Sequence, residues 1–162
     1  MTTKKIPQTP GSAYDSDYGS FVQNLDLIGL ALKNCRCELD RGAFFAQNDN
    51  IKMFSHEYTL THLGEKTFDA EGHFELAITE SEEKAPAVRM DCVFETHFHS
   101  KNPIRPDDAE RFVGSELKLI LVPHARQFFF ALSGQMAIPP VVVPLTTRAN
   151  ASRRKKKVRV PA

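Results

Sequence analysis

The chain has 162 residues, of which 41% are hydrophobic and 25% are charged, and its formal net charge is +1. This size and balance are typical of one globular domain and exclude a general electrostatic preference for nucleic acid or anionic membrane. Three cysteines make no disulfide framework, and neither a secretory signal nor an apolar run of membrane-spanning length is apparent, so we expect a cytoplasmic protein.

The N-terminal part of the chain changes character near residue 20. Residues 1–20 are rich in Thr, Lys, Pro, Gly and Ser and are predicted to be a disordered leader. Apolar residues then recur at helical spacing at Phe21, Leu25, Ile28 and Leu32, although residues 27–40 can also be read as extended. We therefore predict a short helix followed by a strand.

Three segments with the alternation of β-strands follow, at residues 51–63, 67–79 and 88–99. Each segment has an apolar side and a polar side, and turn or loop residues separate one segment from the next. The pattern predicts a meander of long antiparallel strands with one wet face. The apolar face of such a sheet needs a cover.

Residues 109–133 are mostly apolar and are predicted to supply that cover as a helix. Asp107 or Asp108 is placed to cap its start, and Gly134 is placed to end it. Pro123 lies inside this segment and predicts a kink, or two helices that meet near residues 122–123.

The last part of the predicted helix carries apolar residues on all sides, so it must be covered on more than one side. A second copy of the chain is the expected second cover. Residues 138–145 contain several prolines and are predicted to be extended. Residues 146–162 are predicted to be a disordered basic tail.

The segment Pro123-His124-Ala125-Arg126-Gln127 resembles the aromatic-Pro-Tyr-Ala-Arg-Glu segment of the SecB export chaperones. Those chaperones continue with a glycine, a Pro-containing turn, an aliphatic run and another proline, and residues 134–144 follow the same plan. The resemblance assigns a structural role to the matching positions, which are Pro123, Ala125, Arg126, Pro140 and Pro144.

This resemblance implies an α+β fold, with a Greek-key-like four-stranded antiparallel sheet covered by a kinked C-terminal helix in a domain spanning residues 21–145. It also implies assembly into a dimer or a tetramer, no catalytic residues, no metal and no cofactor. The implied activity is ATP-independent holding of unfolded polypeptides or preproteins, for export or for a dedicated client such as a toxin–antitoxin pair. Delivery to a SecA-like motor uses an acidic tail in the family, whereas residues 153–159 here are basic.

Six aromatic residues are candidates for a groove that binds apolar client segments: Phe54, Tyr58, Phe74, Phe94, Phe98 and Phe129. The competing interpretation places them in the core between sheet and helix, and only partial exposure would favour the groove. Phe128, Phe129 and Phe130 cannot all face one side of a helix. At least one of these three is therefore expected at an interface, in a groove or in solvent.

The sequence contains no complete pattern for metal binding, catalysis or nucleic-acid binding. His97 and His99 share a strand face, as do Cys35 and Cys37, but neither pair has the further ligands that a metal site needs. No catalytic triad or nucleotide-binding glycine motif is recognisable. The basic tail lacks interleaved aromatics, so nucleic acid is not the expected partner.

Two alternatives to a holdase remain from the sequence. One is a non-chaperone adaptor module that binds one specific protein partner. The other is a small β-rich ligand-binding or enzymatic domain, which would need a deep polar pocket with convergent titratable groups.

Overall fold

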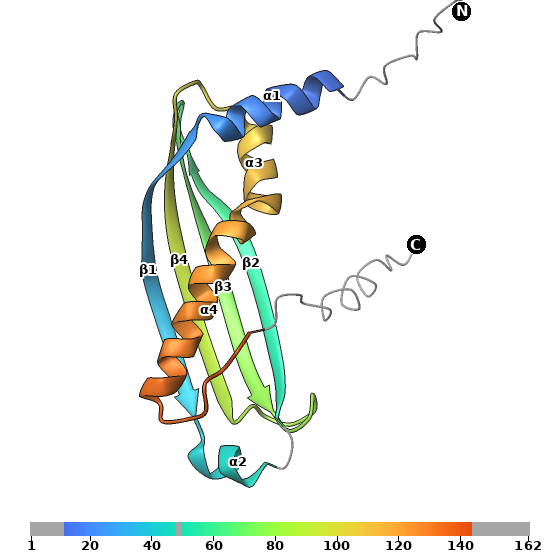
Figure 1. Cartoon of the computed structure of the whole chain (residues 1–162), viewed down its shortest axis with the longest axis vertical. Coiled ribbons are helices and arrows are strands. Elements are labelled where there is room, and N and C mark those ends of the chain that lie inside the picture. The colour runs from blue at the N-terminus through green and yellow to red at the C-terminus, as the bar shows by residue number, and fades with distance from the viewer. Residues whose placement is uncertain (1–11, 48–49, 144–162) are drawn as a thin grey trace, which may run out of the picture.

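The computed structural model describes residues 12–47 and 50–143, which form one antiparallel sheet with helices packed on it (Figure 1). The elements in chain order are α1 (Ser12–Gln23), β1 (Leu25–Leu39), α2 (Arg41–Ala46), β2 (Ile51–Leu63), β3 (Thr67–Thr79), β4 (Val88–Ser100), α3 (Pro106–Ser115) and α4 (Leu117–Gln135). The strand order is β1-β4-β3-β2, so three consecutive strands form a meander and β1 returns beside the last of them. This is the predicted Greek-key-like arrangement.

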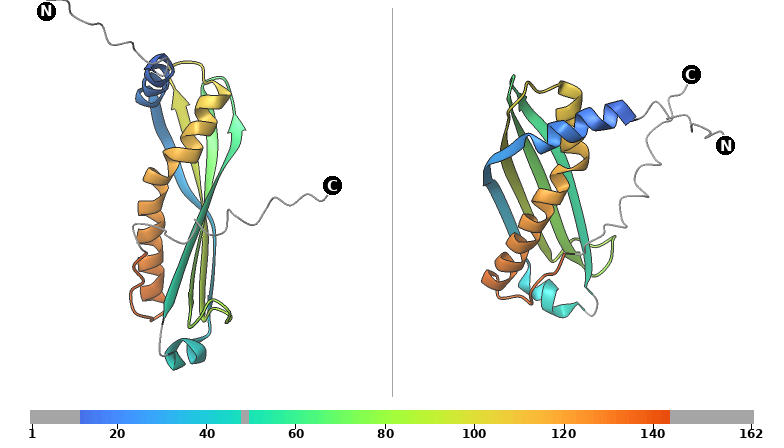
Figure 2. Two further views of the ribbon diagram at one scale, coloured as in Figure 1. Left: turned by 90° about the vertical axis from the view of Figure 1, so that its right-hand side faces the viewer. Right: turned by 45° about the horizontal axis from the view of Figure 1, so that its top comes forward.

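The three strands that showed the clearest alternation occur where they were predicted, with only the end of β4 one residue later. In β3 and β4, the even-numbered side chains are buried against the helices and most odd-numbered ones reach the opposite face. Figure 2 shows α3 and α4 along one face of the sheet, whereas no helix in the described part of the chain covers the other face.

Aromatic side chains fill the layer between the sheet and the helices. Phe68 and Phe98 stack with ring centroids 4.8 Å apart, and the edge of Phe112 from α3 meets the Phe98 ring at 5.2 Å. Further along the sheet, Gly72 of β3 lets α4 approach closely, because a Cβ there would lie 2.6 Å from Leu121 Cδ1. Helix α4 therefore packs directly on the sheet at Gly72, and aromatic side chains fill the space on either side of this contact.

The cover consists of two helices, as one reading of Pro123 allowed, but their junction is not at the proline. The break follows Gly114 and Ser115, which are poor helix formers, and Pro123 lies inside α4 with an exposed ring. Neither Asp107 nor Asp108 caps α3, because Arg105 holds the N-cap position and makes no side-chain cap hydrogen bond.

The end of α4 also differs from the prediction. The helix continues through Gly134 to Gln135, and the residue with left-handed backbone is Ala137, with φ of 55°. The amide of Ile138 donates to the carbonyl of Ser133 at 3.2 Å, which closes the helix end. Ala137 therefore occupies the left-handed position after the helix, where glycine is usual, and the prediction that Gly134 ends the helix was wrong.

The N-terminal segment contains a helix that the composition did not indicate. Residues 12–20 were predicted to belong to a disordered leader, but they lie in α1. Tyr18 is buried with the guanidinium carbon of Arg111 3.9 Å from its ring centroid, and Phe21 meets Phe112 edge to face at 6.4 Å. These contacts with α3 explain why α1 forms. The rest of the predicted leader, Pro144 and the basic tail lie outside the described residues.

Helix α2, which crosses between the two edge strands, was not predicted. Its start is capped by Asp40, whose carboxylate accepts a hydrogen bond from the amide of Ala43 at 2.9 Å. Phe44 is buried, whereas Phe45 is 63% exposed. The Asp40 cap was a readable signal for this short helix.

Candidate functional site

The six aromatic residues proposed for a client groove lie mostly in the core. Five of them are buried between the sheet and the helices: Phe54, Phe74, Phe94, Phe98 and Phe129. Tyr58 alone is half-buried, and burial raises the pKa of its hydroxyl to about 12. The structure therefore places these five rings where the competing core interpretation put them, without the partial exposure that would favour a groove, and their role in client binding stays a prediction.

The three consecutive phenylalanines of α4 point in different directions, as predicted. Phe129 is fully buried and meets Phe54 edge to face at 6.3 Å. Phe128 makes the same kind of contact with Phe94 at 6.1 Å. Phe130 is 53% exposed and points away from the sheet. The outward ring marks an exposed apolar surface on the outer face of α4.

Phe130 lies in the wall of a groove of about 290 Å³ between the outer face of α4 and the extended residues that follow the helix. The lining residues are Pro123, Arg126, Gln127, Phe130, Val141, Val142 and Val143. Those from α4 are spaced so that they share one face of the helix. The groove is therefore formed by two segments that are neighbours in sequence and are separated by the turn at Ala137.

Hydrogen bonds through one serine hold the extended segment beside the helix. The hydroxyl of Ser133 donates to the carbonyl of Phe130 at 2.7 Å and accepts from the amide of Val141 at 3.1 Å. Val141 and Val143 are buried, while Val142 between them is exposed. Val141 and Val143 therefore anchor the extended segment in the core, and the side chain of Val142 is exposed at the groove.

The groove is part of a longer apolar stripe. Leu119, which is also exposed, lies on the same face of α4 as Pro123 and Phe130, nearer the start of the helix. Arg126 places one cationic head at the edge of this stripe. An exposed apolar strip bordered by a polar group is typical of a surface that binds another polypeptide.

A second exposed apolar surface lies at the β1 edge of the sheet. Among the described residues, β1 pairs only with β4, so one side of its backbone has no strand partner. Leu27, Ile28 and Leu32 along it are exposed. A long apolar edge strand is a ready template for pairing with another chain.

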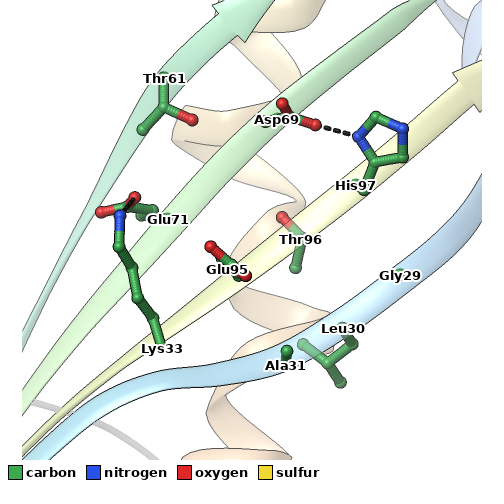
Figure 3. A pocket seen from close by; sticks show the side chains of 10 residues that line it. All are labelled: Gly29, Leu30, Ala31, Lys33, Thr61, Asp69, Glu71, Glu95, Thr96 and His97. Atoms are coloured by element: carbon green, nitrogen blue, oxygen red, sulfur yellow. Dashed lines mark hydrogen bonds and ion pairs between the residues drawn. The ribbon is translucent and has the colours of Figure 1, made fainter.

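A larger hollow is different in character. It occupies about 510 Å³ on the helix-free face of the sheet, and four of its charged side chains form two pairs (Figure 3). Lys33 and Glu71 form an ion pair at 2.5 Å, which raises the pKa of Lys33, and His97 contacts the carboxylate of Asp69. Within residues 12–47 and 50–143, no three His, Cys, Asp or Glu side chains converge as a metal site.

No protein-family model matches the sequence, and no curated protein matches it. Among solved structures, a SecB-like chaperone of Mycobacterium tuberculosis, solved in complex with a ChAD peptide from the HigA1 antitoxin, has a TM-score of 0.64 to this chain. The match covers 82% of this chain and 98% of that chain, at 15% sequence identity. The fold is SecB-like. A protein of unknown function from Streptococcus agalactiae is less similar, with a TM-score of 0.44 at 8% identity over 74% of this chain and 96% of that chain.

The SecB-like fold confirms the resemblance first indicated by the Pro123 motif and places that motif in space. Pro123 and Arg126 line the groove, whereas Ala125 is on the buried side of α4 and Pro140 is exposed in the extended segment. The sequence indicated that at least one of the three phenylalanines would point outward, and Phe129 was the one chosen as a groove candidate, but the exposed residue is Phe130. No helix in the described part of this SecB-like chain is long and apolar enough to cross a membrane.

Proposed function

We propose that this chain is a SecB-like holdase that binds non-native polypeptides without ATP. The observation that carries the proposal is the open apolar groove between α4 and residues 141–143, on a SecB-like fold. An extended client presents side chains at a period of two, so alternate apolar groups can enter a shallow groove while the others face water. This mode of binding needs apolar surface and no defined client sequence.

The energetics suit a holding function. Each apolar client side chain that leaves water contributes about 1.5–3 kcal/mol before the cost of ordering the client is subtracted. Phe130, Val142 and Leu119 offer several such contacts along one helix face. Contacts of this size sum to useful affinity, and each one breaks readily when the client is released.

A dedicated polypeptide client, such as a toxin–antitoxin pair, is the form of this proposal that the comparison supports best. The SecB-like chaperone of Mycobacterium tuberculosis was solved with a peptide from an antitoxin. General export through a SecA-like motor has less support, because residues 153–159 are basic where the family uses an acidic tail. We propose the cytoplasm as the place of action.

We also propose that the working unit is an oligomer in which β1 of one copy lies against β1 of a second. The exposed residues of this edge would then be covered. Ile28→Lys places a charge in that edge, and light scattering on the eluting protein should show a smaller assembly. Thr59→Lys makes the same kind of change on β2, the opposite edge, and should leave the mass unchanged. An unchanged mass for Ile28→Lys would refute pairing through β1.

The direct test of the holdase is aggregation of a chemically denatured protein, followed by light scattering at equimolar chain and without nucleotide. We expect the native chain to suppress aggregation and Phe130→Ala to weaken client binding about tenfold, since it removes one large apolar contact. Phe45→Ala is the matched control, because that phenylalanine is similarly exposed but does not line the groove.

Three outcomes of this assay are informative. Loss of suppression in Phe130→Ala, with retention in Phe45→Ala, supports the groove as the client site. Equal activity of both variants would remove the groove from the proposal. A folded oligomer that fails to suppress aggregation, yet binds one protein tightly, would favour the adaptor function.

A further inference from the structure

The three cysteines lie together on the helix side of the β1–β4 pair, although Cys92 is far from Cys35 and Cys37 in sequence. Cys35 of β1 is directly opposite Cys92 of β4 in the antiparallel register. The register is regular from Asn34 to Leu39, so no bulge displaces the two residues from each other. Directly opposed residues in an antiparallel pair have their Cα atoms about 4.5–5.5 Å apart, which lies inside the span that a disulfide bridges.

We propose that Cys35 and Cys92 form a reversible disulfide that fastens the edge strand β1 to the inner strand β4. Both cysteines are free thiols in the structure, with Cys35 exposed and Cys92 buried. The proposal concerns a redox modification of the fold and is independent of the holdase function.

The exposures of the two thiols set the order of the reaction with a small disulfide such as oxidised glutathione. The exposed Cys35 thiolate attacks one sulfur of that disulfide, forms a mixed disulfide and releases one glutathione thiol. Cys92 then loses its proton and attacks Cys35 Sγ, which releases the second glutathione thiol. Two protein thiols are oxidised to one disulfide, and one glutathione disulfide is reduced to two thiols.

Cys92 is suited to the second step rather than the first. It is fully buried, and burial raises the pKa of its thiol to about 12, so it does not meet an external oxidant as a thiolate. Its nearest route to oxidation is the neighbouring sulfur of Cys35 across the strand pair.

Cys37 is the competing partner, and its position is less favourable. It follows Cys35 by two residues on the same strand, at about 6.6 Å between Cα atoms, near the upper limit for a disulfide. The residue opposite Cys37 is Met90, which offers no thiol. The thiol of Cys37 instead donates to the sulfur of Met136, which follows α4, at 2.9 Å. The register therefore selects Cys92 over Cys37 as the partner of Cys35.

The test is oxidation of the full folded chain with glutathione disulfide, followed by alkylation and mass spectrometry. We expect two of the three thiols to disappear and the mass of the chain to fall by two hydrogens. Trypsin cuts after Lys33, Arg36 and Arg89, so it separates all three cysteines. The expected product is residues 34–36 joined to residues 90–101, and dithiothreitol should release it.

Variants make the assignment specific. Cys37→Ser should retain the disulfide, and Cys35→Ser should abolish it while leaving the buried Cys92 unmodified. A Cys35–Cys37 link, a link between two chains, or three intact thiols in a folded chain whose urea-unfolded form is oxidised would each overturn the proposal. None of these readouts depends on client binding or on substitution of the buried cysteine.

Discussion

Adjacent phenylalanines of α4 should differ sharply in what they contribute to stability. Phe129 is fully buried against Phe54, whereas Phe130 is 53% exposed in the groove. Phe129→Ala leaves a cavity as well as losing the transfer free energy, so we expect it to lower the free energy of unfolding by about 3–5 kcal/mol. Phe130→Ala loses only about half of one side chain's burial and should cost about 1 kcal/mol.

The assay for this pair is urea unfolding at one fixed chain concentration, because assembly would otherwise shift the midpoints. With a slope of about 2 kcal/mol per molar urea, the midpoint should fall by about 2 M for Phe129→Ala and about 0.5 M for Phe130→Ala. Equal shifts would refute the assignment of Phe130 to an open surface and would place it in a covered interface.

Three further changes test the packing, the helix end and the titration of the fold. Gly72→Ala should lower stability by about 1–3 kcal/mol, because its new methyl group meets Leu121; an unchanged melting temperature would show that the leucine moves aside. Ala137→Gly should raise stability in urea by up to about 1 kcal/mol, since glycine accepts positive φ without strain, and a loss would contradict the left-handed backbone. Burial, with a smaller contribution from Lys118, lowers the pKa of His56, so the folded chain binds fewer protons there than the unfolded chain. That contribution to stability is present above about pH 6.5 and is lost as pH falls through the folded pKa, so the urea midpoint should drop less in His56→Gln between about pH 7.5 and about pH 5.

The sheet could be predicted from the sequence because its signal is local. Alternation in β2, β3 and β4 fixes both the strand bounds and the face that each side chain takes. The partner of β1 could not be found in this way, since pairing with β4 depends on the whole meander being in place. The resemblance to the SecB chaperones supplied that step.

The helical layer shows where local signals are insufficient. Pro123 is a strong breaker by type, yet its exposed ring fits the outside of α4, and the break occurs after Gly114 instead. Helix α1 forms because Tyr18 and Phe21 find partners on α3, which no pattern near residue 18 can reveal. In both cases tertiary contacts decide the outcome.

The candidate site was the hardest part to predict, because burial is a property of the fold and not of the residue type. Phe94 and Phe130 look alike in sequence, but one lies under α4 and the other points away from the sheet. The groove also needs the turn at Ala137 to bring Val142 back beside the helix. An alanine rarely adopts the left-handed conformation, so the sequence does not indicate a turn at this residue.

The strand order has a consequence for how this chain comes to be folded. Of the four described strands, β1 leaves the ribosome first, and its only partner among them, β4, leaves it last. The apolar residues of β1 therefore have no partner strand until β2, β3 and β4 have been synthesised. The long chain segment between β1 and β4 also slows their pairing, because its ends must be brought together. During that interval the newborn protein displays the kind of extended apolar segment that its finished form is proposed to hold.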